Sequence, residues 1–262
     1  MSALALSPDT PPVARTVLVT GGARRIGREI ALELARHGWR VAVHFRASEA
    51  EALQTAADCA RLTPGSATFH AELADEAQAR ALVDTVVARF GRLDALVNSA
   101  STFQLDDAQD FTFDSLDRHM HANVGAPVLL AQALHRHLEH AGRKGCAVNL
   151  LDQKLWNVNP DFLSYSLSKA ALQLATAMLA QRLAPRLRVA AVAPGLSLPS
   201  YLQSDADFAR TARHSLTGEA SNAQDVASAV RFLIETPSMT GSTMLVDGGQ
   251  HLVPMTRDVS FL

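Results

Sequence analysis

The sequence is poor in cysteine, in net charge and in long apolar runs, and each shortage excludes a class of protein. Cys59 and Cys146 are the only two cysteines in 262 residues, and they lack CxxC spacing, which argues against a disulfide framework and a zinc site. The formal net charge of −2 gives no basic footprint for nucleic acid. No stretch reaches the roughly 18 apolar residues that a membrane span needs. We therefore expect a soluble cytoplasmic protein that binds neither nucleic acid nor a membrane.

The N-terminus also lacks the features of a targeting signal. Met1 to Ala14 contains a short Ala-Leu-Ala-Leu patch without a basic leader, and Pro8, Pro11 and Pro12 follow it. We expect residues 1–14 to form a flexible tail. The length and the 48 % of hydrophobic residues suit one α/β domain, which we predict at 15–249. A partly apolar C-terminal tail at 250–262 would then be available to pack on a neighbouring subunit.

Short apolar runs alternate with helix-favouring segments throughout 15–249. The predicted strands are 15–20, 40–45, 67–71, 95–98, 147–152, 187–193 and 243–246. The predicted helices are about 25–37, 49–62, 75–90, 113–140, 164–185 and 222–235. This alternation indicates a single Rossmann-type, doubly wound α/β domain with a seven-stranded parallel sheet flanked by helices. Ligands of such sheets bind outside the carboxyl ends of the strands.

A glycine-bearing turn follows the first predicted strand. Gly21 and Gly22 begin it, Ala23, Arg24, Arg25 and Ile26 continue it, and Gly27 lies in the helix that it opens. Such a turn lets a phosphate approach backbone amides at the partly positive helix N-terminus. The alternative is a tight connection with no ligand.

The end of the second predicted strand bears on the choice of dinucleotide. An acid near this position binds the 2′-hydroxyl of NAD, whereas a cation accommodates the 2′-phosphate of NADP. Here Phe45 is followed by Arg46 and Ser48, with no acid before Glu49. Arginine matches phosphate with a planar fork of charged hydrogen bonds, which favours NADP. The alternative is a solvated arginine at a strand end.

Asp152, Tyr165 and Lys169 form the candidate proton-transfer site. Asp152 ends an apolar strand, and the four-residue spacing of Tyr165 and Lys169 puts both on one helical face. We expect the ammonium to favour the charged phenol and bring it closer to proton exchange at neutral pH. On its own, the same spacing also arises by chance in surface helices.

Three further segments have weaker signals. Small residues at 99–101 leave room for a flat ring, and Phe103 is either a stacking partner for that ring or an ordinary core residue. The polar stretch 199–218 is a candidate substrate cover. The helix at 113–140 carries five histidines without acidic or cysteine partners, which indicates a solvated face and no metal site; they are His119, His121, His135, His137 and His140.

Several motifs together resemble the short-chain dehydrogenase/reductase superfamily. They are Thr20-Gly21 with Gly27, Asn98-Ser99-Ala100, Asn123, Tyr165-x-x-x-Lys169, Pro194-Gly195 and Asp247-Gly248-Gly249. Two departures are informative: Arg25 replaces the usual middle glycine of the turn, and Asp152 replaces the usual serine. Both resemble the pteridine reductase branch, as do 44–48, 98–103 and 194–197.

The resemblance implies roles for individual residues. Asp152, Tyr165 and Lys169 would be catalytic. Arg25, Ser101, Phe103, Asp152, Tyr165 and Leu196 would bind the substrate, with Phe103 stacked on a pterin. NADP(H) would be bound by a larger set, namely Gly21, Arg24, Arg25, Ile26, Gly27, Phe45, Arg46, Ser48, Glu72, Leu73, Asn98, Ser99, Ala100, Ser101, Asn123, Tyr165, Lys169, Pro194, Gly195 and Ser197. The resemblance also suggests a homotetramer.

The leading hypothesis is an NADPH-dependent reductase of a dihydropterin or dihydrofolate. A pterin must receive hydride at carbon and a proton at a neighbouring nitrogen, and a buried carboxyl beside a phenol suits the second task. A short-chain reductase of a ketone or 3-oxoacyl thioester is the alternative, because the segment after Pro194 that selects the substrate cannot be decoded from one sequence. A nucleotide-sensing scaffold without catalysis is a third reading, which Tyr165 and Lys169 disfavour.

Overall fold

A seven-stranded parallel sheet forms the centre of the computed structural model, which describes residues 14–198, 204, 208, 211 and 215–261. The strand order is β3-β2-β1-β4-β5-β6-β7, with every neighbouring pair parallel. The strands are β1 (Thr16–Thr20), β2 (Arg40–Phe45), β3 (Ala67–His70), β4 (Ala95–Asn98), β5 (Gly145–Leu150), β6 (Leu187–Pro194) and β7 (Thr243–Val246). The predicted fold class is confirmed.

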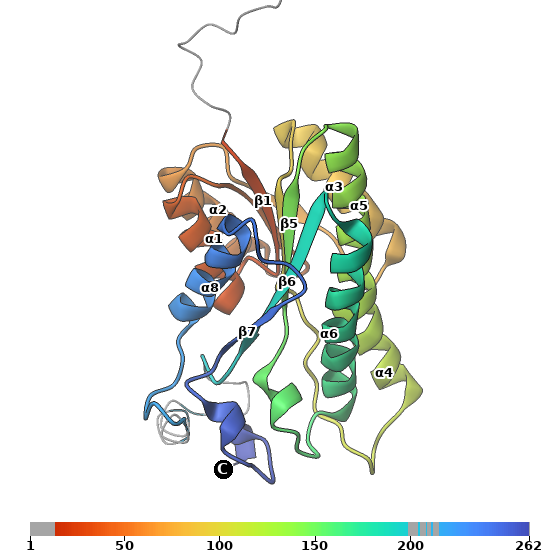
Figure 1. Cartoon of the computed structure of the whole chain (residues 1–262), viewed down its shortest axis with the longest axis vertical. Helices are drawn as coiled ribbons and strands as arrows, with labels where there is room; N and C mark the ends of the chain where they lie inside the picture. The colour runs from red at the N-terminus through yellow and green to blue at the C-terminus, as the bar shows by residue number, and fades with distance from the viewer. Residues whose placement is uncertain (1–13, 199–203, 205–207, 209–210, 212–214, 262) are drawn as a thin grey trace, which may run out of the picture.

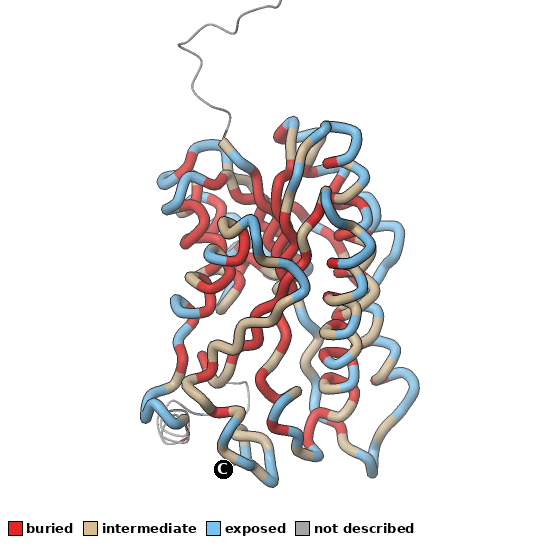
Figure 2. Tube along the Cα trace, viewed as in Figure 1, coloured by how far each residue is buried: buried red, intermediate tan, exposed pale blue. Residues whose placement is uncertain are grey.

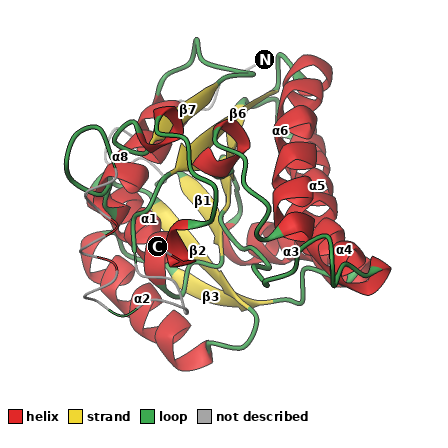
Figure 3. Ribbon diagram, turned by 90° about the horizontal axis from the view of Figure 1, so that it is seen from below, coloured by secondary structure: helices red, strands yellow, loops and turns green. Residues whose placement is uncertain are grey.

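Helices cover both faces of this sheet (Figures 1 and 3). One face carries α1 (Arg25–Arg36), α2 (Glu49–Leu62) and α8 (Ala223–Glu235). The other carries α3 (Glu76–Phe90), α5 (Ala126–His140) and α6 (Leu163–Leu183), and α4 (Phe113–Met120) packs beside α6. Because the strands are buried on both sides, they need apolar side chains at nearly every position, which explains their continuous apolar sequence.

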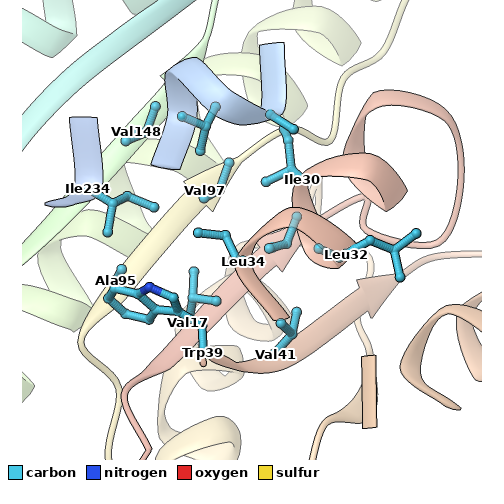
Figure 4. Packing of buried hydrophobic residues seen from close by; sticks show 14 of the residues in the cluster. Val17, Ile30, Leu32, Leu34, Trp39, Val41, Ala95, Val97, Val148 and Ile234 are labelled. Carbon is cyan, nitrogen blue, oxygen red and sulfur yellow. The ribbon is translucent and has the colours of Figure 1, made fainter. Parts of the chain in front are cut away.

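The core is therefore split into two layers by the sheet, as the buried trace in Figure 2 shows. On the α1/α2/α8 face, Val17 and Val97 of the sheet meet Ile30 and Leu34 of α1, and Trp39 closes the end of the cluster (Figure 4). Both cysteines, Cys59 and Cys146, are buried in this layer. The layered core holds the strand ends in fixed positions, and the candidate site lies there.

The predicted element bounds need small corrections. The fifth strand is Gly145–Leu150, so Asp152 follows the strand instead of ending it. The predicted helix at 113–140 is interrupted by a π-helical turn, His121–Gly125, which contains Asn123. A π-helical turn widens the helix locally and is common at functional sites.

The histidines of this segment do not all face solvent. His119 is buried; its Nδ1 lies 2.7 Å from the Ser115 carbonyl oxygen, and its Nε2 accepts from the Gln104 N–H at 3.3 Å. His137 is half-buried and its Nε2 accepts from the Leu93 N–H. The prediction of a fully solvated face was wrong for these two, because each bonds a loop that a sequence pattern does not place. Over the described residues, no group of three or more histidine, cysteine, aspartate or glutamate side chains is arranged to hold a metal ion.

The two predicted tails differ in what the structure describes. Residues 1–13 of the N-terminal tail lie outside the described residues, as does most of the candidate cover at 199–218. The C-terminal segment packs on its own chain, beside the loop that follows β5 (Figure 1). Within the described part of the chain, no helix is long and apolar enough to cross a membrane.

Candidate active site

The glycine turn after β1 is packed so closely that side chains are excluded. A Cβ on Gly27 would lie 2.2 Å from the Gly21 carbonyl oxygen, and one on Gly21 would lie 2.9 Å from the Cα of Ala100. Gly21 also has a φ of 63°, which favours glycine. The turn therefore brings its backbone amides against the end of β4, at the topological switch between β1 and β4.

A buried histidine holds this turn in place. The Gly21 N–H donates to Nδ1 of His44 at 3.0 Å, and Nε2 of His44 contacts the Ala71 carbonyl oxygen at 3.0 Å. Since an N–H can only donate and a carbonyl can only accept, the ring is neutral with its proton on Nε2. Burial lowers the pKa of His44 to about 4. The sequence analysis did not identify this linking role.

Arg25 occupies the backbone conformation that a glycine usually takes. Its φ is 54°, in the left-handed region, and it replaces the middle glycine of the related motif. Burial, with the neighbouring charge of Arg24, lowers the pKa of Arg25 below its ordinary value. Ile26, the next residue, packs partly into the core. A strained arginine at the start of α1 places a guanidinium where the related motif has no side chain.

Two exposed arginines with weak partners follow neighbouring strands, Arg24 after β1 and Arg46 after β2. Arg46 lies 3.8 Å from Glu72, and Arg24 lies 3.8 Å from Glu51, with all four side chains at least two-fifths exposed. Such pairs contribute little to stability. Ser48 precedes α2 and makes no capping bond with its side chain, while Phe45 and Leu73 are buried.

Thr20 connects β1 to the loop after β4. Its hydroxyl accepts from the N–H groups of Ser99 and Ala100 at 3.0 and 3.1 Å. Next to it, the amide of Asn98 donates to Asn149 at 2.8 Å. The side-chain oxygen of Asn98, Oδ1, is buried with no hydrogen-bond partner in the described residues. A hydrogen-bond acceptor is therefore left unused at the end of β4.

Asn123, in the π-helical turn, connects the loop after β4 to α6. Its Oδ1 accepts from the Thr102 N–H at 2.7 Å and from the Ser101 hydroxyl at 3.2 Å. Its Nδ2 donates to the Ser168 hydroxyl at 2.9 Å. Ser101 itself is exposed. The π-helical turn thus holds the loop that carries Ser101 and Phe103.

The structure brings the predicted catalytic residues together. The phenol of Tyr165 donates to Oδ2 of Asp152 at 2.8 Å. Nζ of Lys169 lies 5.5 Å from the centre of the Tyr165 ring and donates to the Leu150 carbonyl at 2.7 Å. Tyr165 and Lys169 are buried and Asp152 is half-buried, so the pair is not the surface pair that chance spacing would give.

The electrostatics of this trio differ from the expectation. Burial raises the pKa of Asp152 above its ordinary value. Burial and the charge of Asp152 raise the pKa of Tyr165 well above 10. Burial lowers the pKa of Lys169 to about 8, against the opposing effect of Asp152. The expectation that Lys169 brings the phenol toward proton exchange was wrong, because it left out burial and the charge of Asp152.

Phe103 contacts both Tyr165 and a second phenylalanine. Its ring stacks on Phe162 with centroids 4.3 Å apart and planes 17° apart, and it meets Tyr165 edge-on at 4.7 Å. Phe103 is half-buried, whereas Phe162 is fully buried. One face of Phe103 is therefore packed against protein, and its role as a pterin stacking partner stays a prediction.

Asp106 caps the helix that carries Tyr165 and Lys169, and the sequence analysis missed it. Helix α6 begins after Phe162, which has a left-handed backbone and no capping side chain. Asp106 supplies the cap from a distant loop: it accepts from the N–H of Ser164 at 3.0 Å, from the Ser164 hydroxyl and from the Ser115 hydroxyl at 2.8 Å. Burial opposes the charge of Asp106, but these hydrogen bonds outweigh it and lower its pKa. Beside this cap, the ring of His119 lies 6.5 Å from that of Tyr165.

The segment after β6 is also pinned. A Cβ on Gly195 would lie 2.6 Å from the Cβ of Asp247, so this position also needs glycine. The Leu196 N–H donates to Gln250, and the Ser197 hydroxyl lies 2.9 Å from that of Ser221. Pro194 ends β6. These contacts place the predicted residues 194–197 at the same sheet edge as the glycine turn.

The donor set at this edge suits a dinucleotide phosphate. The glycine turn has no room for side chains where α1 begins, the N-terminus of a helix favours an anion, and Arg24, Arg25 and Arg46 supply positive charge. Oδ1 of Asn98, which has no hydrogen-bond partner in the described part of the chain, lies farther along the edge. These residues fit an NADP-type cofactor.

Comparison with known proteins points the same way. Residues 21–251 match the family model described as Enoyl-(Acyl carrier protein) reductase. The structure of FolM Alternative dihydrofolate reductase 1 from Brucella canis complexed with NADP is similar, with a TM-score of 0.85 and 39 % identity over 93 % of this chain and 97 % of that chain. Pteridine reductase 1 of Leishmania tarentolae is 30 % identical over 93 % of this chain and 98 % of its own length. The 3-oxoacyl-(acyl carrier protein) reductase of Staphylococcus aureus (strain Mu50) is also 30 % identical, over 92 % of this chain and 99 % of its own.

Proposed function

The chain belongs to the short-chain dehydrogenase/reductase superfamily, in its pteridine reductase-like branch, and on that premise we propose that it reduces a dihydropterin or dihydrofolate. The chain is an oxidoreductase with NADP(H) as its cofactor. The single observation that supports a pterin substrate is the 2.8 Å hydrogen bond between Tyr165 and a carboxylate, Asp152, where the superfamily usually has a serine.

We assign the cofactor contacts to the edge formed by the ends of β1, β2 and β4. Arg46 and Ser48 would hold the 2′-phosphate, and the glycine turn with Arg25 would hold the pyrophosphate. NADPH, when bound, supplies the hydride. The remaining task of the chain is to deliver one proton to the substrate.

Asp152 is the proposed source of this proton. Tyr165 alone is a poor acid, because burial and the neighbouring carboxylate raise its pKa well above 10. The raised pKa of Asp152 keeps a larger fraction of that carboxyl protonated near neutral pH. When Asp152 is protonated, its carboxyl donates to the phenol oxygen, and the phenol is free to pass its own proton to the ring nitrogen and regain one from Asp152. Lys169, buried beside the phenol ring, stabilises negative charge on it during transfer.

The test is turnover of NADPH with dihydrobiopterin, dihydromonapterin and dihydrofolate side by side. We expect consumption with at least one of them, and a loss of two or more orders of magnitude in kcat for Asp152→Ala and Tyr165→Phe, since each removes part of the proton path. Circular dichroism and NADPH binding serve as controls for folding. Unchanged kcat in both variants would refute these roles.

Reduction of a ketone or 3-oxoacyl thioester is the second candidate. The similarity to a 3-oxoacyl-(acyl carrier protein) reductase supports it, since the two chains align over nearly their full lengths. Turnover on acetoacetyl thioesters with none on pterins would favour this candidate. Tight NADPH binding without turnover on any substrate would favour a sensing scaffold.

We further propose that the enzyme is a cytoplasmic homotetramer. Helix α6 exposes an apolar stripe of Leu167, Leu174 and Met178, whose side chains are 46 %, 64 % and 61 % exposed. Their spacing puts them on one helical face, opposite the buried Lys169 face. A second copy of the chain would cover this stripe. Sedimentation of the wild type against Leu174→Glu tests the assembly: a single species of unchanged mass in the variant would contradict a contact through α6.

A further inference from the structure

The C-terminal segment is tied to the loop that joins Asp152 to Tyr165. The side-chain amide of Asn157, in this loop, donates to the carbonyls of Gln250 and Val253 at 3.2 and 2.8 Å. The Asn157 carbonyl oxygen accepts from the Met255 N–H at 3.2 Å. One buried asparagine thus fixes three backbone groups of a segment about a hundred residues away. The two segments, green and dark blue, lie beside each other in Figure 1.

A second connection lies nearer the catalytic helix. The carboxylate of Asp161 accepts from Nε of Arg257 at 2.9 Å and from the Asp258 N–H at 2.7 Å. The ring of Phe261 stacks on that of Phe162 at 6.2 Å, and Phe162 in turn stacks on Phe103. The C-terminal segment therefore contacts the aromatic residues of the site through Phe162.

The third connection is a buried ion pair made by Lys154, two residues after Asp152. Lys154 is only 4 % exposed, and its Nζ donates to Oδ2 of Asp258 at 3.1 Å and to Asn159. The backbone N–H of the same lysine donates to Oδ1 of Asp152 at 2.8 Å. A buried ammonium without a carboxylate is strongly unfavourable, so Asp258 is needed to keep Lys154 in this position.

We propose that Asp258 is a positioning residue of the active site. The C-terminal segment places Asp258 against Lys154, and this ion pair fixes the loop at Asp152 and sets the charge around the Asp152 carboxyl. The inference rests on the proposed role of Asp152 as proton source. It assigns the C-terminal segment a task in the proton transfer of its own chain.

The charges that face Asp152 define the direction of the effect. Tyr165 and Lys169 face it from α6, Lys154 from its own loop, and Asp258 from the C-terminal segment. The negative charge of Asp258 favours the protonated form of Asp152, and Lys169 opposes it. Neutralising residue 258 should therefore make Asp152 lose its proton at lower pH.

The experiment is Asp258→Asn, which keeps the shape of the side chain and removes its charge. The titration of Asp152 is followed by NMR, through the resonance of its carboxyl carbon in protein labelled at aspartate. This resonance is assigned by its loss in Asp152→Asn, and the measurement needs neither substrate nor cofactor. We expect the midpoint to fall by about half a pH unit to one pH unit, a threefold to tenfold change in proton affinity. The alkaline limb of the kcat profile should move the same way, with KM for NADPH unchanged.

Glu33→Gln is the matched control. Glu33 is a buried carboxylate paired with Arg231 at 2.9 Å between α1 and α8, on the opposite face of the sheet from α6. Its neutralisation should leave the Asp152 titration unchanged. If Asp258→Asn does not fold, Arg257→Gln loosens the same segment at a half-exposed side chain and should give a smaller shift in the same direction.

An Asp152 titration that is the same in wild type and in the folded variant would overturn the inference, as would an equal shift in Glu33→Gln. These outcomes are separate from a failure of the proposed function. Full activity of Asp152→Ala would refute the proton role, whereas the NMR titration would still measure the effect of Asp258.

Discussion

His44 should make the stability of this enzyme depend on pH between about 6.5 and about 4. The ring is buried where the ends of β1, β2 and β3 meet, and it accepts the Gly21 N–H at Nδ1. A second proton would have to enter at Nδ1, where that N–H already points. Burial accordingly lowers the pKa of His44 from 6.5 to about 4.

The sign follows from which state binds the extra proton. Because the pKa of His44 in the folded protein lies below its value in the unfolded chain, the unfolded chain binds one more proton between the two values. The contribution is fully present above pH 6.5 and is lost as the pH falls toward 4. A difference of about 2.5 pH units corresponds to about 3 kcal/mol in the free energy of unfolding.

The assay is urea unfolding over a pH series, with wild type compared with His44→Gln. Glutamine keeps an acceptor for Gly21 and a donor for Ala71 and does not titrate. Carboxylates titrate in both proteins, so the difference between the two curves isolates His44. We expect the wild type to lose about 3 kcal/mol more than the variant on acidification. Parallel curves would refute the reasoning, and His140→Gln, at an exposed position, should leave the wild-type slope unchanged.

Two more substitutions test the supports of the site. Asp106→Ala removes the cap of α6 and should lower the free energy of unfolding by about 2 kcal/mol, with kcat reduced and NADPH affinity retained. Recovery of stability in Asp106→Asn would support capping. An unchanged melting temperature in the alanine variant would contradict it. Arg25→Gly relieves about 1 kcal/mol of backbone strain at a similar entropic cost, so stability should change little while NADPH or pterin binding weakens. Fluorescence titration with NADPH and KM for the pterin measure this, and unchanged values for both would exclude a binding role for Arg25.

Features that depend on local sequence could be predicted. The continuous apolar runs identify the strands because both faces of a parallel sheet are covered, and the strand ends then place Gly21, Arg46 and Asp152 on one edge. The four-residue spacing put Tyr165 and Lys169 on one helical face, as the structure has them.

Features that depend on contacts between residues far apart in the sequence could not be predicted. Helix α6 has no cap of its own, which signals a missing partner, but nothing in the sequence selects Asp106 over other acids. His119 and His44 pair with loops whose positions the tertiary fold decides. The pKa of Tyr165 was predicted in the wrong direction because spacing reveals Lys169 but not the depth of burial.

The layered core also determines how this enzyme can be labelled. Both thiols lie inside the α1/α2/α8 layer, and burial raises the pKa of Cys59 to about 12 and that of Cys146 to about 11. Alkylating reagents act on exposed thiolate, so the native protein offers them no target. A cysteine introduced on the surface would be the one reactive thiol, and a spin label or fluorophore could be attached there without first replacing the native cysteines.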